Sequence, residues 1–177
     1  TDEHGVKIYE TAKEAGVDTQ EFVDKNAQKY IALKGQLHLS YDDFIRTTSA
    51  RHKAGVTKIW KKMEEAGDIY KGVYKGNYCV GCEAFIPDKD LVDGKCTIHQ
   101  KAPQILEEEN YFFKLSKYSE RIKELISDDT LLVLPESRKK EMLNIIGEEG
   151  LKDVSFSRPK NILPWGIPVP GDDSQVM

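Results

Sequence analysis

The chain has 177 residues, of which 39% are apolar and 32% are charged, with a formal net charge of −4 and a mean hydropathy of −0.55. This composition is typical of a folded soluble protein with one ordinary domain, or with a core and a small appended module. It argues against a membrane protein, because no apolar run approaches the ~20 residues that cross a bilayer, and it gives no global attraction to DNA or RNA.

The first third of the chain is predicted to be helical. Residues 7–15 contain few helix breakers, and Asp18 is a good N-cap for a second helix that ends near Gly35. Residues 37–45 alternate between apolar and polar side chains, which favours a strand or an extended segment. Ser49 is then placed to cap a third helix.

A metal-binding pattern follows in the middle of the chain. From residue 68 the apolar period changes to two, which predicts a pair of short strands. The next residues read Cys-x2-Cys-x13-Cys-x2-His, and this pattern contains every cysteine of the chain. Gaps of two residues let a tight turn bring both members of a pair to one zinc ion. Four protein ligands leave no position for a substrate, so we expect one structural zinc per chain, held by Cys79, Cys82, Cys96 and His99.

Other interpretations of the cysteine pattern are weaker. A redox dithiol favours a helix start behind the first cysteine, whereas Gly81 and strand-like residues surround this one. Cys96 and His99 form the second pair of the pattern, and the remaining alternative is that they stand at metal-ligand spacing only by chance. Because the zinc accounts for all three cysteines, no disulfide framework argues for secretion, and we expect a cytoplasmic location.

The last third is predicted to combine strands and helices. A strand over residues 111–115 leaves the metal module, Ser116 caps the next helix, and Pro135 opens another. Residues 151–158 alternate as in a strand. Residues 163–172 are too rich in proline for a helix or a central strand and are predicted to form an extended loop.

Outside the metal pattern, few residues point to chemistry. The sequence contains no phosphate-binding loop of the Walker type, no nucleophile elbow and no cysteine left over as a nucleophile. Periodicity and spacing alone therefore predict a soluble α/β protein with a zinc site. The chemically capable side chains that remain are Asp2, His4, Arg46, His52 and Arg158.

Eight short strings, in order along the chain, resemble the methionyl-tRNA synthetases, and the resemblance covers almost the whole sequence. Each string alone is weak, but eight in the family's order are highly specific. They are Thr1–Gly5, Tyr41–Thr48, Gly67–Gly72, Tyr78–Cys82, Glu108–Tyr118, Leu134–Arg138, Gly150–Arg158 and Trp165–Gly171.

The resemblance implies a fold and a division of the chain. A class I aminoacyl-tRNA synthetase has a Rossmann-type α/β catalytic domain that is split by an inserted α+β module with a zinc knuckle. By this match, residues 1–68 would form the helical part of the catalytic domain and residues 69–115 the insertion with its knuckle. Residues 116–177 would complete the insertion and return to the catalytic domain.

The resemblance also implies an activity and its residues. Such an enzyme uses ATP, with Mg²⁺, to convert methionine to methionyl-adenylate, and then transfers the aminoacyl group to the 3′ end of tRNA(Met). By the match, Asp2 would face the α-ammonium group of methionine, and His4 in the same string would also bind substrate. Arg158 would lie near the nucleotide, where a guanidinium offsets developing charge; its alternative role is a salt bridge at a strand end.

Some family features are not found in the sequence. The two ATP signature motifs, of the HIGH and KMSKS types, are absent, and His99 stands where many relatives have cysteine. We therefore expect a middle piece of the catalytic region that does not activate methionine alone.

Two rival interpretations remain. Another class I synthetase shares the split architecture, although the compact knuckle and the string from Trp165 argue for the methionine type. A stand-alone zinc ribbon that binds RNA or a protein would show a basic patch with aromatic residues around the knuckle. Here the lysines around the knuckle are offset by Glu83, Asp88, Asp90 and Asp93.

Overall fold

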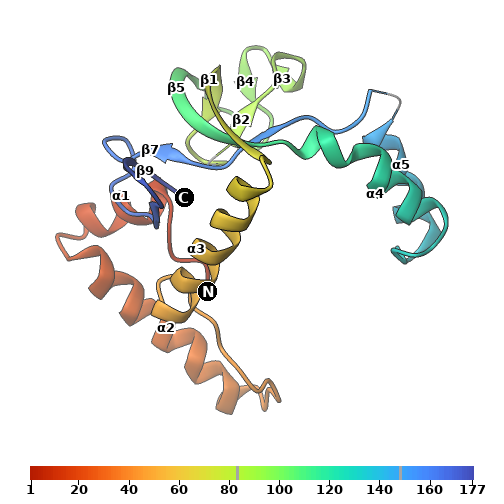
Figure 1. Cartoon of the computed structure of the whole chain (residues 1–177). Coiled ribbons are helices and arrows are strands. Elements are labelled where there is room, and N and C mark those ends of the chain that lie inside the picture. The colour runs from red at the N-terminus through yellow and green to blue at the C-terminus, as the bar shows by residue number, and fades with distance from the viewer. Residues whose placement is uncertain (83, 148) are drawn as a thin grey trace.

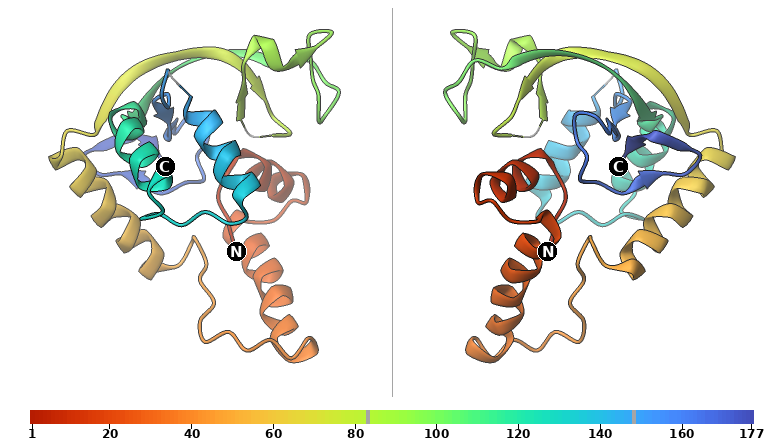
Figure 2. Two further views of the ribbon diagram at one scale, coloured as in Figure 1. Left: turned by 90° about the vertical axis from the view of Figure 1, so that its right-hand side faces the viewer. Right: turned by 90° about the vertical axis from the view of Figure 1, so that its left-hand side faces the viewer.

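The computed structural model describes residues 1–82, 84–147 and 149–177. A long two-stranded ribbon arches from the helical N-terminal part to a small module at its far end (Figures 1 and 2). The expected mixture of helices and strands is confirmed. Glu83, which we expected to offset lysines near the knuckle, and the side chain of the neighbouring Lys89 lie outside the described part of the chain.

The three N-terminal helices form as the sequence predicts. They are α1 (Val6–Glu14), α2 (Thr19–Gln36) and α3 (Ala50–Glu65). The Asp18 carboxylate accepts the backbone N–H groups of the first turn of α2, and the Ser49 hydroxyl accepts an N–H in the first turn of α3. Residues 37–45 between α2 and α3 form neither helix nor strand.

The arch is a single antiparallel ribbon of β1 (Ile69–Cys79) and β5 (Gln104–Phe113), in register along almost their whole length. The prediction of two short strands before the knuckle was therefore wrong. Gly72 lies inside β1, where a Cβ atom would stand 3.4 Å from the rings of Tyr70 and Phe112, so it allows close packing and does not end a strand.

The second strand of the ribbon also begins earlier than predicted. We expected a strand from residue 111, but β5 starts at Gln104 and includes a run of glutamates. The two exposed glutamates, on either side of the buried Glu108, pair with lysines across the ribbon: Lys75 pairs with Glu107, and Lys71 pairs with Glu109. Cross-strand ion pairs of this kind stabilise a strand in a segment whose composition alone disfavours one.

The far end of the ribbon carries the cysteine and histidine pattern. Strand β2 (Ala84–Ile86) pairs with the last residues of β1. A short 3-10 turn (Asp88–Asp90) leads to a minimal hairpin of β3 (Leu91–Val92) and β4 (Lys95–Cys96). Its turn is made by Asp93 and Gly94, both with positive φ, a conformation that an Asp-Gly pair readily adopts.

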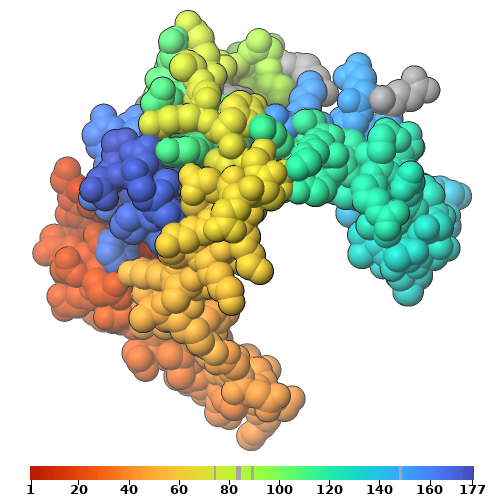
Figure 3. Space-filling view, in the orientation of Figure 1, coloured from red at the N-terminus to blue at the C-terminus, as the bar shows by residue number. Residues whose placement is uncertain are grey.

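Beyond the ribbon, the chain forms a helical limb. A 3-10 turn (Leu115–Tyr118) precedes α4 (Ser119–Ser127), and α5 (Glu136–Ile146) returns beside it. The space-filling view shows this limb standing apart from α3 (Figure 3). We predicted that Ser116 caps α4, and this was wrong. The Ser116 hydroxyl instead donates to Asp153, which ties the limb to the next strand.

The chain ends in short strands that return to the ribbon. β6 (Val154–Ser155) pairs with the end of β5, so the sheet order is β2-β1-β5-β6. β7 (Arg158–Pro159), β9 (Asp172–Val176) and β8 (Pro168–Val169) form a separate three-stranded sheet in that order. The predicted strand over 151–158 is thus two short ones, and part of the predicted loop over 163–172 is a strand.

One tryptophan joins these parts. Trp60 of α3 is 1% exposed, and its ring lies 5.2 Å from that of Tyr111 on β5 and 4.8 Å from that of Phe156. Helix α3, the ribbon and the segment that leads into β7 therefore share one aromatic core. The described strand pairs are all antiparallel, so the parallel sheet of a Rossmann-type domain is not formed by these strands alone.

Candidate functional site

The four predicted metal ligands come together at the tip of the ribbon. Their ligand atoms all lie within 4.8 Å of one another. Cys79 ends β1, Cys82 follows in the connection to β2, and Cys96 ends β4. After Cys96, a tight turn, in which the N–H of residue 100 donates to the Cys96 carbonyl at 2.8 Å, turns the chain so that His99 Nδ1 faces the three sulfur atoms.

The cluster has the dimensions of a zinc site. Tetrahedral zinc with Zn–S of about 2.3 Å and Zn–N of about 2.0–2.1 Å implies S···S edges of about 3.8 Å and S···N edges of about 3.6 Å. The Sγ atoms of Cys82 and Cys96 are 3.6 Å apart, and the three sulfur atoms lie 3.2–3.9 Å from His99 Nδ1. The residues present therefore fit the metal.

The thiols of Cys96 and Cys82 differ in acidity. The backbone N–H of His99 lowers the pKa of Cys96 to about 6, whereas burial and the neighbouring thiols raise the pKa of Cys82 to about 12. A metal binds the thiolate, so Cys96 supplies its ligand at neutral pH and the metal must displace a proton from Cys82.

Gly81 is needed for this geometry. A Cβ atom on residue 81 would stand 2.5 Å from Cδ2 of the His99 ring. We expect Gly81→Ala to push the imidazole of His99 away and to weaken zinc binding. The expected loss of affinity is about 10–100-fold, which is typical when a residue that supports a metal ligand is changed. Competition with a chromogenic chelator measures this. The matched control is Gly55→Ala on α3, where a Cβ meets nothing within 4 Å, and equal zinc affinity in both variants would contradict the prediction.

A second group of residues lies below the ribbon. Asp2 and His4, at the start of the chain, and Arg158, more than 150 residues later, line one cavity of about 270 Å³. Tyr78, next to the metal ligand Cys79, lines the same cavity. The structure thus brings together the three residues that the resemblance singled out and places them beside the metal module.

The N-terminal segment that carries Asp2 is held by a buried ionic network. The Glu3 side chain is 4% exposed and accepts two hydrogen bonds from Arg46, at 2.8 and 3.0 Å. The hydroxyl of Thr48 also donates to Glu3, and the indole of Trp165 donates to the Glu3 carbonyl at 2.6 Å. Two distant regions of the chain, at residues 46–48 and at Trp165, therefore hold Glu3 and with it the backbone between Asp2 and His4.

Glu3 was not predicted from the sequence as a residue of the site. Three of the eight strings, Thr1–Gly5, Tyr41–Thr48 and Trp165–Gly171, meet at this network, and their joint occurrence was the available signal. Arg46 was recognised only as chemically capable. The structure shows that its guanidinium is used by Glu3 and by Asp24, which lies 2.6 Å away.

His4 lies half-buried beside Trp165, with ring centroids 5.7 Å apart. Burial is the main cause that lowers its pKa, and the charge of the nearby Lys53 lowers it further. The imidazole is therefore neutral at pH 7 and can donate or accept a hydrogen bond without adding charge beside Asp2.

Arg158 is held between two aromatic rings and a carboxylate. Its Nη1 donates to Oε2 of Glu108 at 2.7 Å, and the Glu108 side chain is 2% exposed. Its Cζ lies 4.7 Å from the ring centroid of Tyr78 and 4.8 Å from that of Phe85. The salt bridge that we considered as its alternative role is present, and the same side chain lines the cavity with Asp2.

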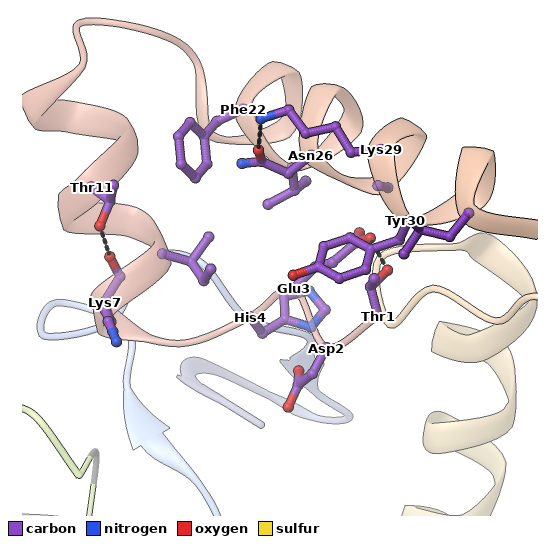
Figure 4. Close-up of a pocket in the computed structure, with 14 residues that line it drawn as sticks. Thr1, Asp2, Glu3, His4, Lys7, Thr11, Phe22, Asn26, Lys29 and Tyr30 are labelled. Carbon is purple, nitrogen blue, oxygen red and sulfur yellow. Dashed lines mark hydrogen bonds between the residues drawn. The ribbon is translucent and has the colours of Figure 1, made fainter. Parts of the chain in front are cut away.

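A larger cavity of about 840 Å³ lies on the other side of the N-terminal segment, between α1 and α2. Figure 4 shows Tyr30 of α2 beside His4, whereas the Asp2 carboxylate points away from both helices. Thr1–Gly5 thus separates two hollows, and Asp2 and His4 line both.

Comparisons with known proteins agree across the whole chain. The family model described as tRNA synthetases class I (M) matches residues 1–96 and 88–177. The chain is 43% identical to a methionine–tRNA ligase of Nostoc sp. strain PCC 7120, covering 100% of this chain and 33% of that protein. It is also 43% identical to one of Clostridium acetobutylicum, covering 100% and 27% respectively. The chain thus spans about a third of the length of these curated relatives.

A solved structure shares the fold. The Mycobacterium tuberculosis methionyl-tRNA synthetase in complex with methionyl-adenylate superposes with a TM-score of 0.89 at 35% identity, and the match covers 100% of this chain and 35% of that one. The described architecture is therefore that of a class I synthetase catalytic domain.

Proposed function

This chain belongs to the class I tRNA synthetases of the methionine type, and we propose that it forms part of the catalytic region of a methionine–tRNA ligase. The proposed reaction uses ATP, as its Mg²⁺ complex, to activate methionine and then charges tRNA(Met). The observation that carries the proposal is the cavity in which Asp2, His4 and Arg158 meet.

The three side chains suit the first half of this reaction. The methionine carboxylate attacks the α-phosphorus of ATP, the bond to pyrophosphate breaks, and methionyl-adenylate forms. The exposed carboxylate of Asp2 would pair with the substrate ammonium group, and the neutral His4 would hydrogen-bond the substrate beside it. The guanidinium of Arg158 would offset the negative charge that develops at the phosphate. A ribose hydroxyl at the tRNA 3′ end would then displace AMP.

We assign zinc a structural role in this enzyme. The Cys79, Cys82, Cys96 and His99 cluster would hold one Zn²⁺ with four protein ligands, which leaves no position for a substrate. We propose the division expected from the resemblance: residues 1–68 in the catalytic domain, 69–115 in the insertion with its knuckle, and 116–177 completing the insertion and returning to the catalytic domain.

The rival interpretations have less support. A stand-alone RNA-binding ribbon would need free basic side chains, whereas Lys71 pairs with Glu109 and Asp172, and Lys75 pairs with Glu107. Other class I synthetases are disfavoured by the match to the methionine-type family over the whole chain. No described helix is both long and apolar enough to cross a bilayer. A cytoplasmic location stays a prediction, since one relative is named as mitochondrial.

The test is Asp2→Asn in the full-length enzyme. We expect the KM for methionine in ATP–pyrophosphate exchange to rise by about 10–100-fold, because a hydrogen bond between charged groups is lost. The KM for ATP should change little. Asp173→Asn, at an exposed position of β9, is the matched control. Unchanged methionine kinetics in the Asp2 variant would remove this residue from the substrate site.

A further inference from the structure

The zinc module and the cavity share one structural element. Tyr78 and Phe85 face each other across β1 and β2, and their ring centroids are 5.2 Å apart. The hairpin that carries them is closed by the segment with the first two metal ligands: Cys79 directly follows Tyr78, and Cys82 precedes Phe85 by three residues. The position of both rings therefore depends on how the metal end of the hairpin is closed.

Both rings contact Arg158 on a distant part of the chain. The guanidinium carbon lies within 5 Å of each ring centroid, at 4.7 and 4.8 Å, which is the geometry of a cation–π contact. The Arg158 side chain is 19% exposed and Tyr78 is 6% exposed, so these contacts are shielded from water. Arginine is a long side chain with several rotamers, and the two rings select one of them.

The third group that holds the Arg158 guanidinium is a carboxylate. Glu108 on β5 accepts from Arg158 at 2.7 Å, and Asn110 donates to the same oxygen, Oε2, at 3.3 Å. The other carboxylate oxygen of Glu108, Oε1, is buried and has no hydrogen-bond partner among the described residues. Loss of the arginine would thus leave a buried carboxylate without compensation, and this ties Arg158 to the ribbon as well as to the hairpin.

We propose that Tyr78 and Phe85 are positioning residues for Arg158 and that metal binding at the cysteine cluster controls the orientation of Arg158 in the cavity through them. Metal loss loosens the end of the β1–β2 hairpin, the two rings lose their fixed places, and the guanidinium leaves its place in the cavity that Arg158 lines with Asp2. The structural zinc thereby acts on the site without contacting a substrate. The activity consequence rests on the proposed function, whereas the structural link does not.

The first measurement follows the exposure of Arg158 in the full-length protein. Phenylglyoxal modifies accessible guanidinium groups, and peptide mass spectrometry reads each arginine separately, with the 63% exposed Arg51 as internal reference. We expect Tyr78→Leu with Phe85→Leu to raise the modification rate of Arg158 about tenfold relative to Arg51. Chelation of zinc from the unaltered protein should give a similar rise, and chelation from the double variant should add little.

Two further variants separate positioning from general damage. Tyr78→Phe keeps the ring and should preserve the low reactivity of Arg158. Tyr70→Leu removes a different Tyr–Phe pair, in which the Tyr70 ring on β1 stacks on the Phe112 ring on β5 with centroids 5.4 Å apart, and should leave Arg158 protected. If Arg158 reacts equally in zinc-loaded and zinc-free protein, the coupling is wrong. If the double variant keeps its zinc and Arg158 stays protected, the proposed role of the two rings is wrong.

Kinetics of the full-length enzyme provide the second readout. The double variant should lower kcat of methionine-dependent ATP–pyrophosphate exchange about tenfold with an unchanged KM for methionine, and Tyr78→Phe should retain wild-type rates. If the unaltered enzyme shows no such exchange, the proposed function fails, yet the labelling results still decide the link between metal and Arg158. A rise in the KM for methionine with an unchanged kcat would overturn the positioning role.

Discussion

Removal of zinc is expected to unfold the tip of the ribbon while the rest of the chain stays folded. Of the residues between Val80 and Gln100 whose side chains the structure describes, Cys96 alone is buried; Val92 and Ile98 are 60% and 75% exposed. Such a module gains little from apolar burial, whereas structural zinc sites supply about 10–16 kcal/mol of apparent binding free energy in small zinc domains.

Hydrogen exchange measured with and without a chelator at neutral pH tests this. The amides of Cys96 and Gln100, which bond within the knuckle, should exchange roughly 100-fold faster in the zinc-free protein. Amides in the middle of β1, near Gly72, and in α4 should keep their protection. Cys96→Ser should reproduce the effect without a chelator. Unchanged exchange at the knuckle after confirmed zinc loss would show that packing alone holds the module.

The local features of this fold could be predicted from the sequence because they depend on neighbouring residues. Asp18 and Ser49 cap helices by contacting N–H groups two or three positions away. The candidate metal ligands could be picked out for a similar reason, since each half-site lies within four residues and needs only a tight turn. Composition and spacing carry this information directly.

The ribbon could not be predicted in the same way. Gly72 breaks a strand by local propensity, and Glu107 to Glu109 disfavour one, yet both segments form long strands because each pairs with the other. The paired residues of the two strands are 26 to 44 positions apart in the sequence. Tertiary pairing overrides local preference here, as is usual for strands.

The site was predicted in part, and only through the resemblance. That match singled out Asp2, His4 and Arg158, and the structure places them around one cavity. It did not single out Glu3 or the aromatic pair that holds Arg158. Residues that support a site from behind have no motif of their own, because their role follows from contacts between distant segments.

The second large effect is expected at the buried pair of Glu3 and Arg46. Arg46→Met should lower the free energy of unfolding at pH 7 by about 3–5 kcal/mol, because it leaves the carboxylate of Glu3 buried without its cation. Arg51→Met is the matched control: Arg51 pairs with Asp43 on the surface, with side chains 63% and 62% exposed, and its loss should cost about 1 kcal/mol or less. Urea unfolding measures both.

The pH dependence of the free energy of unfolding shows whether Arg46→Met loses stability through electrostatics or through packing. In the unaltered protein, burial raises the pKa of Glu3, but the hydrogen bonds from Arg46, Thr1 and Thr48 outweigh it and hold the pKa below its ordinary value of about 4.3. The folded pKa is the lower one, so this stabilisation is present above about pH 4.3 and is lost as the pH falls through the folded pKa.

In Arg46→Met, burial is no longer opposed by the guanidinium and the Glu3 pKa should rise, so the variant recovers stability on protonation. The difference from the unaltered protein should therefore be largest at neutral pH and shrink as the pH falls from the Glu3 pKa of the variant to the lower Glu3 pKa of the unaltered protein. Adding Glu3→Gln to Arg46→Met should remove most of the deficit at pH 7, because a neutral amide replaces the uncompensated charge. A deficit that is independent of pH and unaffected by Glu3→Gln would assign the role of Arg46 to packing.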